Sequence, residues 1–271
     1  MNNDHGYASD QTPPPVLAAE EVASKMGRLV RSAFPAAWAV VLGGSLMRGA
    51  GTPTSDADVL VLTDDASAPY RSSSVFEGLR VEAFVHTARS YRAYASADCA
   101  RGVPILPTLC AEGRAVVDRS EELRTLRSEA RTLLAAGPPA LTAEQVDDYR
   151  YFLTDLVEDL EGLGFVHGPD GERVCTADRL FLLLGEFSLR AARRWTGAGK
   201  WLYRRLTDWD AEGARRLLVA AAQAREGDVR SLIGLADDAL APYGGRLFDG
   251  YWRKGPMPPP SRSLNLRTEG G

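Results

Sequence analysis

Two aspartates separated by one residue, Asp56 and Asp58, stand at the start of an apolar run. Ten residues lie between them and the pair Gly44-Ser45. In a strand, residues i and i+2 point to the same side about 6.6 Å apart, so both carboxylates are expected to face one site. Two such charges drawn to about 4 Å repel by roughly 4 kcal/mol at an effective dielectric of 20. A cation must offset that repulsion. Mg²⁺, a hard ion that prefers oxygen ligands, is the predicted cofactor, as one or two ions.

The Gly-Ser pair is typical of a phosphate-binding turn. At Gly43-Gly44 the absent side chains would let a triphosphate approach the backbone closely. Ser45 offers a hydroxyl and an N–H at the start of a helical turn, where the amide dipoles favour an anion. Gly44 and Ser45 are therefore predicted to bind nucleotide.

A third carboxylate, Glu82, lies in the alternating segment Leu79–His86. Leu79, Val81, Ala83 and Val85 are expected on one face, and Arg80, Glu82, Phe84 and His86 on the other. If this strand lies beside residues 56–63, Glu82 reaches the same cluster. There it would either ligate a second metal ion or act as the general base for an acceptor hydroxyl.

These residues need a sheet to position them. Helical spacing predicts a helix over residues 17–34, and apolar runs predict strands over 38–42, 56–63 and 79–86. A helical turn over 46–50 and a loop over 51–55 connect the first two strands. After residue 90 we expect one or two helices, a short strand around 115–117 and a helix over 121–136.

The second half of the chain contains only helix signals. The break Gly137-Pro138-Pro139 marks a domain boundary, and Thr142 with Gln145 resembles a capping box. Beyond it, further helices are predicted over 178–195, 210–225 and 228–241. The expected organisation is a disordered lead-in (1–15), a sheet-containing domain (16–136), an all-helical domain (137–255) and a disordered tail (256–271).

Charge and composition narrow the partners. A net charge of −4 argues against a general nucleic-acid binder, which would need a basic surface. No apolar stretch approaches the roughly 20 residues that span a membrane. Cys99, Cys110 and Cys175 have no CxxC spacing and indicate reduced thiols. We expect a cytoplasmic protein; its oligomeric state is not legible from the sequence.

The order Gly44-Ser45, ten residues, Asp56-x-Asp58, then a carboxylate on a following strand resembles the polymerase-β-like nucleotidyltransferase superfamily. The form Gly-Ser-x-x-Arg-Gly with Ser-Asp-x-Asp looks like the branch of bacterial antibiotic nucleotidyltransferases, including aminoglycoside adenylyltransferases. The motifs cover residues 41–86. The resemblance implies an α+β fold: an N-terminal nucleotidyltransferase domain, a mixed sheet with flanking helices, and a C-terminal all-helical acceptor-binding domain.

It also implies the reaction: magnesium-dependent transfer of a nucleoside monophosphate from an NTP, with ATP favoured, to a hydroxyl of a small molecule, releasing pyrophosphate. Carried over by position, Gly44 and Ser45 would contact the triphosphate, Asp56 and Asp58 would bind Mg²⁺, and Glu82 would be base or third ligand. Ser55, which opens the second motif, is a further nucleotide-binding candidate. Arg48 is either a phosphate contact or a solvent-facing charge.

The acceptor is open: an aminoglycoside-like antibiotic, another metabolite, or a protein or RNA end. A non-catalytic nucleotide-binding module is a further alternative. In the helical half, Asp148, Asp155 and Glu158 are candidates for holding a cationic acceptor, or they are a solvated helix face. Four aromatic residues either line an acceptor pocket or pack in the core: Trp195, Trp201, Tyr203 and Trp209. Three basic residues either bind triphosphate or lie on the surface: Lys200, Arg204 and Arg205.

Overall fold

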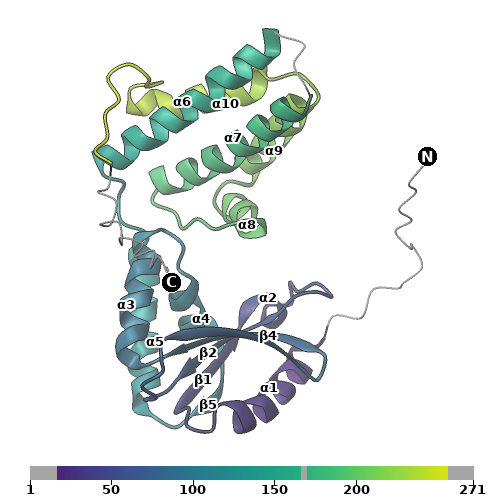
Figure 1. Cartoon of the computed structure of the whole chain (residues 1–271), viewed down its shortest axis with the longest axis vertical. Coiled ribbons are helices and arrows are strands. Elements are labelled where there is room, and N and C mark those ends of the chain that lie inside the picture. Colours follow the sequence, from purple (N-terminus) through teal and green to yellow (C-terminus); the bar gives the residue numbers. More distant parts are fainter. Residues whose placement is uncertain (1–16, 166–169, 256–271) are drawn as a thin grey trace, which may run out of the picture. The chain divides into compact units, whose positions relative to one another are not determined.

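A five-stranded mixed sheet forms in the first half of the chain, with the strand order β3-β4-β2-β1-β5 (Figure 1). The structure, a computed structural model, describes residues 17–165 and 170–255. The predictions for residues 1–15 and 256–271 lie outside the described residues. The strands are β1 (Ala39–Gly43), β2 (Ala57–Leu62), β3 (Tyr70–Phe76), β4 (Leu79–His86) and β5 (Arg114–Asp118). β2 and β4 run parallel, whereas β1 pairs antiparallel with β2 and β5, and β3 antiparallel with β4.

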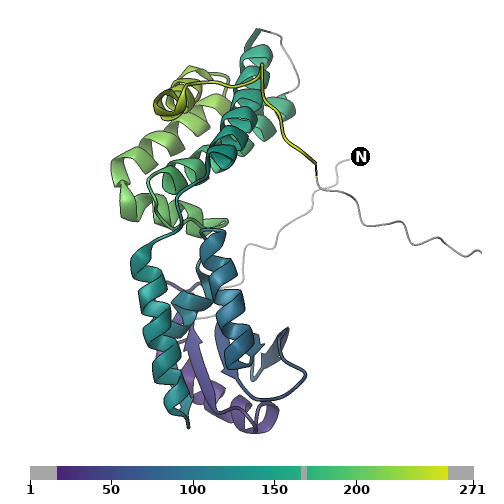
Figure 2. The ribbon, with the colours of Figure 1, turned by 90° about the vertical axis from the view of Figure 1, so that its left-hand side faces the viewer.

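Helices cover both faces of this sheet. One face packs on α1 (Ala19–Ala33) through the alternate residues Ala57, Val59 and Val61 of β2. The other face packs on α3 (Ala88–Ala100), α4 (Ile105–Glu112) and α5 (Glu121–Ala136). Figure 2 shows α3 and α5 side by side on this second face. Because neighbouring strand residues point to opposite faces, the polar positions of β2 and β4 lie on the side of α3–α5.

The predicted fold class is confirmed: a mixed sheet with flanking helices, followed by an all-helical region. The predicted strands over 38–42, 56–63, 79–86 and around 115–117 correspond to β1, β2, β4 and β5. β3 was not expected. It is an edge strand whose residues are almost all exposed, so it shows no alternation of apolar and polar positions. Glu77 and Gly78, both at positive φ, make the two-residue turn from β3 to β4.

The second half consists of α6 (Ala143–Phe165), α7 (Asp170–Ala191), α8 (Lys200–Trp209), α9 (Ala211–Arg225), α10 (Arg230–Leu240) and a short 3₁₀ turn, Ala241–Tyr243. The predictions over 178–195, 210–225 and 228–241 correspond to α7, α9 and α10, whereas α8 was not predicted. No described helix is long and apolar enough to span a membrane.

The chain divides into two compact units that do not follow the predicted boundary at 136/137. Of the described residues, unit 1 contains those up to Leu141 together with Gly185–Arg216, and unit 2 contains those within Thr142–Leu184 and those from Leu217 onward. The segment Gly185–Arg216, which includes α8, is therefore part of the sheet-containing unit.

Hydrogen bonds attach this returning segment within unit 1. The indole Nε1 of Trp195 donates to the carbonyl oxygen of Leu134 (3.2 Å), and the backbone N–H of Thr196 donates to that of Gly102 (2.9 Å). Arg190 Nη2 donates to the carbonyl oxygen of Pro139 (3.3 Å). These bonds fix the chain immediately before α8 against the ends of α3 and α5.

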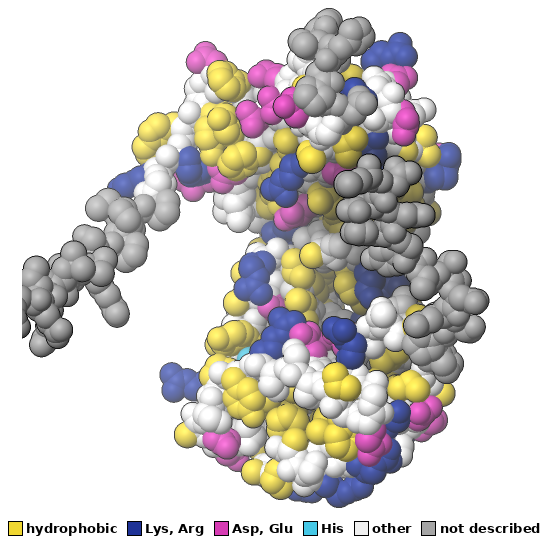
Figure 3. Space-filling model, turned by 45° about the vertical axis from the view of Figure 1, so that its right-hand side comes forward, with side chains coloured by type: hydrophobic (Ala, Val, Ile, Leu, Met, Phe, Trp, Pro, Cys, Tyr) yellow, Lys and Arg dark blue, Asp and Glu magenta, His cyan; other side chains and the backbone are white. Residues whose placement is uncertain are grey.

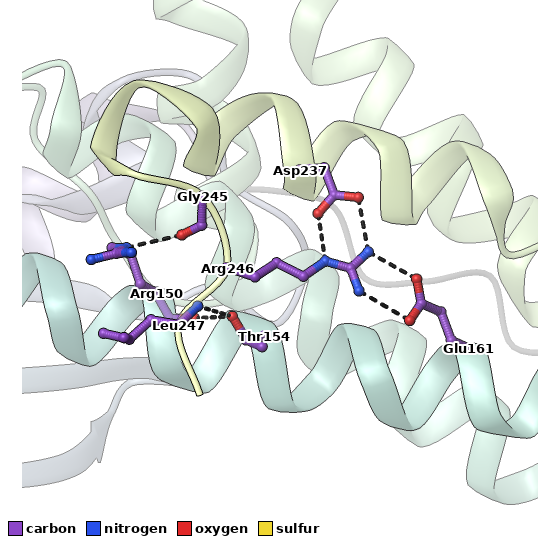
Figure 4. Close-up of polar contacts among 7 residues, drawn as sticks. All are labelled: Arg150, Thr154, Glu161, Asp237, Gly245, Arg246 and Leu247. Carbon is purple, nitrogen blue, oxygen red and sulfur yellow. Dashed lines mark hydrogen bonds and ion pairs between the residues drawn. The ribbon is translucent and has the colours of Figure 1, made fainter. Parts of the chain in front are cut away.

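In unit 2, one arginine joins two helices through ion pairs (Figure 4). The guanidinium of Arg246 pairs with Asp237 of α10 at 2.7 Å and with Glu161 of α6 at 2.8 Å. The backbone N–H of Leu247 donates to the Thr154 hydroxyl (2.9 Å), which holds the same loop on α6. Arg246 and Leu247 thus join their loop to α6 and α10 within unit 2.

Candidate active site

Strand register brings two of the predicted carboxylates together. Asp58 on β2 is the partner of Gly43 on β1 and of Glu82 on β4. Adjacent strands lie about 4.8 Å apart, and residues in register on parallel strands point to the same face. The next residues on that face, Leu60 and Phe84, pack with the core under α3–α5. Asp58 and Glu82 therefore form a row on this face, just beyond the apolar core.

Burial and neighbouring carboxylates act on Asp58. Burial, followed by the negative charges of Asp56 and Glu82, raises its pKa from 3.8 to about 6, and the cations Arg48 and Arg71 partly oppose the shift. Asp56 directly precedes β2. Burial and the two neighbouring carboxylates thus disfavour the ionised form of Asp58.

Gly43 and Gly44 make space for specific neighbours. Gly44 has φ +85°, and a Cβ there would lie 2.2 Å from Asp58 Oδ2. A Cβ on Gly43 would lie 2.5 Å from Leu109 Cδ1. Gly44 is thus required by the carboxylate itself. Close approach of a phosphate to this turn stays a prediction.

Ser45 and Ser55, the two serines predicted to bind nucleotide, contact each other. The Ser45 hydroxyl donates to the Ser55 hydroxyl (3.1 Å), which also accepts the N–H of Thr52 (2.8 Å). These bonds attach α2 (Gly44–Met47) to the loop that leads into Asp56. Ser45 is buried, at 7% exposure.

A cavity of about 320 Å³ opens at the carboxylate row within unit 1. The sheet and α2 contribute Gly44, Arg48, Asp58 and Glu82, α4 contributes an apolar wall, and the returning segment contributes residues from Thr196 to Arg205. Ser45, Ser55 and Asp56 are not among the residues that line it. Its lining carries three arginines and three carboxylates: Arg48, Arg71, Arg205, Asp58, Glu82 and Glu112. Figure 3 likewise shows cationic and anionic side chains interspersed over the visible face.

Arg71 is a site residue that the sequence did not reveal. It lies on the unexpected strand β3, forms an ion pair with Glu82, and places its guanidinium 5.0 Å from the centre of the Phe84 ring. The signal that would have located it is the Glu77-Gly78 turn, since a hairpin there pairs β3 with β4.

The donor set suits a hard divalent cation, because it consists of carboxylate oxygens. Burial, followed by the neighbouring carboxylates, raises the pKa of Asp58, and a bound cation would oppose that shift. In the described part of the chain, no three His, Cys, Asp or Glu side chains are grouped as a ready metal site, and Glu82 is engaged by Arg71. The carboxylates present suit Mg²⁺ by their chemistry, and Asp56 and Asp58 as its ligands stay a prediction.

Arg48 lies at the cavity wall. Its Nη1 is 3.1 Å from Glu112 Oε2, and its guanidinium carbon is 4.7 Å from the centre of the Trp201 ring. Arg204 also lies over this ring, at 4.9 Å, and its Nη2 is 3.4 Å from the carbonyl oxygen of Ala50. Among the aromatic candidates, Trp201 lines the cavity, whereas Trp195, Tyr203 and Trp209 do not.

Other polar residues have different surroundings. His86 is four residues from Glu82 along β4, about 13 Å away. It is buried, which lowers its pKa, and its Nδ1 is 3.3 Å from the Ser90 hydroxyl. In unit 2, Asp148 accepts a hydrogen bond from the Tyr251 hydroxyl (2.7 Å) and pairs with Arg253 (2.8 Å). Asp155 and Glu158 are exposed on α6.

Comparison with protein families gives a match in this region. Residues 25–87 match the nucleotidyltransferase domain family. The matched segment runs from α1 through β4 and contains Gly44, Asp58 and Glu82. A domain of this family implies an NTP substrate and supports nucleotidyl transfer in general, and such domains typically use divalent metals.

The other two comparisons add little. A nucleotidyltransferase-like protein from Exiguobacterium sibiricum has a similar structure with 13% sequence identity and a TM-score of 0.44. The similarity covers 79% of this chain and 76% of that one, a level that adds no functional information. Comparison with curated proteins found no significant match.

Proposed function

We propose that this chain transfers a nucleoside monophosphate from an NTP, with ATP the first nucleotide to test, to a hydroxyl of a small acceptor. The observation that carries the proposal is the register of Gly43, Asp58 and Glu82 across three strands, at the edge of a cavity that Arg48 also lines. A glycine turn, neighbouring carboxylates and a cation at one cavity are the parts that phosphoryl chemistry requires.

In this proposal the acceptor oxygen bonds to the α-phosphorus while the bond from that phosphorus to the β-bridging oxygen breaks. Pyrophosphate leaves, and the hydroxyl proton passes to Glu82 or to water. Asp56 and Asp58 would hold Mg²⁺, which when bound neutralises charge on the phosphates. Gly44, Ser45, Arg48 and Ser55 would position the triphosphate. Glu82 is the base or the third ligand, and its ion pair with Arg71 keeps it beside Asp58.

The charges of the cavity favour a neutral acceptor such as a polyol or sugar. Two of its three carboxylates, Glu82 and Glu112, are already paired with Arg71 and Arg48. A polycationic acceptor such as an aminoglycoside would find little uncompensated negative charge there beyond Asp58. Aminoglycosides remain the acceptor class that the sequence motifs suggest, so both classes belong in the test.

The test is pyrophosphate release with each NTP, with and without Mg²⁺, across neutral and cationic hydroxyl-bearing acceptors. Asp58→Asn should lower the rate by at least about 100-fold, and Glu82→Gln by about 10²- to 10⁴-fold if Glu82 is the base. Asp64→Asn is the matched control. Asp64 is an exposed aspartate just beyond the other end of β2, and this variant should retain the parent rate within about twofold.

Three outcomes count against the proposal. Failure of the parent protein to bind any NTP with Mg²⁺, together with an inert Asp58→Asn, excludes nucleotidyl transfer. Transfer of label from an α-labelled NTP only to protein or RNA in a lysate would identify a macromolecular acceptor instead. Binding of NTP without turnover on any acceptor would indicate a nucleotide-binding module.

A further inference from the structure

Trp201 lies at the wall of the cavity, and all residues that line this cavity belong to unit 1. It lies in the first turn of α8, directly after a segment that is bonded to Gly102 through the N–H of Thr196. Gly197 packs closely under it: a Cβ on Gly197 would lie 2.8 Å from the Trp201 Cβ. The position of the indole is thus determined by the chain before α8.

This indole contacts Arg48, whose side chain is 41% exposed with the ring in place. The guanidinium carbon of Arg48 is 4.7 Å from the ring centre, within the range of a cation–π contact. Glu112 pairs with the same guanidinium at 3.1 Å. The Trp201 ring on α8 and the Glu112 carboxylate on α4 together restrict the side chain of Arg48, the residue that follows α2.

The restricted position is beside the proposed reaction centre. Arg48 and Asp58 line the same cavity, and the charge of Arg48 is close enough to lower the pKa of Asp58. An arginine held there can meet a phosphate without first losing rotamer freedom, because that freedom has already been lost in the free protein.

We propose that Trp201 is a positioning residue for nucleotide binding: it holds the Arg48 guanidinium at the cavity wall, where Arg48 binds the triphosphate. The inference rests on the proposed function. A contact made equally to bound NTP and to the transition state affects KM and leaves kcat unchanged. Loss of the ring should therefore raise the KM for NTP, by about 3- to 30-fold from the strength of a partly desolvated cation–π contact.

The experiment measures kcat, KM and direct NTP binding for Trp201→Leu, Trp201→Phe, Arg48→Met and the double variant Trp201→Leu/Arg48→Met. Trp201→Phe retains an aromatic face and should stay within about threefold of the parent KM. Trp201→Leu should raise KM with little change in kcat. The double variant should be no worse than Arg48→Met, because residues that act through one contact are not additive.

Trp209→Leu is the control for loss of a tryptophan from the same helix. Trp209 is 40% exposed and does not line the cavity, so its variant should keep the parent KM. Circular dichroism and the melting temperature identify any variant that fails to fold. If Trp201→Leu is one of them, Trp201→Met replaces it in the same measurements, with the same expected rise in KM.

Additive effects of the two single variants, a fall in kcat at unchanged KM, or no effect of Trp201→Leu would overturn the role of Trp201. These results leave the proposed function intact provided that the parent protein turns over NTP. Absence of NTP binding by the parent overturns the proposed function as well, so the two failures are distinguishable.

Discussion

Replacing Asp58 by asparagine separates the stability of the site from its chemistry. Asp58 is partly buried among Asp56 and Glu82, and its pKa is raised to about 6. A carboxyl whose pKa is higher in the folded than in the unfolded protein binds protons more tightly when folded. Its contribution to the free energy of unfolding is therefore present at low pH and is lost as the pH rises through about 6.

The size of this effect follows from the shift. From 3.8 to about 6 is roughly 2 pH units, and each unit corresponds to about 1.36 kcal/mol, which sets an upper limit of about 3 kcal/mol at pH 8. Because the carboxyl is partly exposed, solvent screening reduces it, and we expect a cost of about 1 to 3 kcal/mol. Asp58→Asn removes the charge while keeping the shape of the side chain.

The variant should accordingly be more stable than the parent at pH 8 in the presence of a chelator. The difference should shrink as the pH falls and vanish below about 4. Urea unfolding and calorimetry at several pH values measure it. Calorimetry is needed because two compact units need not unfold in one transition. Adding Mg²⁺ should stabilise the parent and leave the variant unchanged.

The reasoning is refuted if Asp58→Asn is equally or less stable at pH 8 without metal, or if the difference does not depend on pH. Either result would mean that Asp58 is not a destabilising charge, and the electrostatic case for a metal at this cluster would fail with it. A stabilised variant that has lost activity would instead show that the site sacrifices stability for function.

Four further predictions concern single features. Gly44→Ala should lower the free energy of unfolding by more than about 1 kcal/mol and abolish turnover, because its Cβ would lie 2.2 Å from the Asp58 carboxylate. Gly49 has a similar positive φ, and a Cβ there would have nothing within 4 Å, so the difference in melting temperature between Gly44→Ala and Gly49→Ala isolates the effect of that contact. The Mg²⁺ affinity measured by calorimetry should fall about fivefold from pH 6 to pH 5 as Asp58, with its pKa of about 6, protonates. Arg71→Met removes a cation that lowers the pKa of Asp58, so the acid limb of the pH–activity profile should move to higher pH. Arg246→Met breaks two ion pairs in unit 2 and should cost about 1 to 3 kcal/mol without changing the NTP affinity, which binding and unfolding measurements will test.

The sheet was largely predictable because its inner strands have a strong local pattern. In β4, alternate residues are buried, so the sequence placed Glu82 opposite Val81 and Ala83 without any tertiary information. β1 is a buried run between Pro35 and the Gly43-Gly44 pair, and β2 is a buried run bounded by aspartates, which limits the alternatives. The motif spacing then located the Gly-Ser turn and the two aspartates.

The residues that were missed depend on contacts distant in sequence. β3 has no buried face, so Arg71 could not be assigned to a strand or to the site. Trp201 lies about 150 residues after Arg48, and nothing in the local pattern of α8 indicates that it meets α2. Such pairings are set by tertiary packing, which a single sequence does not display.

The division of the chain also has a consequence for its synthesis. A polypeptide emerging from its N-terminus can complete all five strands by Asp118, yet the wall that holds Trp201 and Arg205 belongs to Gly185–Arg216. The intervening Thr142–Leu184 belongs to the other unit. A nascent chain that stops after α5 would therefore carry the carboxylates but only part of the cavity around them. Assembly of the complete cavity is delayed until Arg205 has been made.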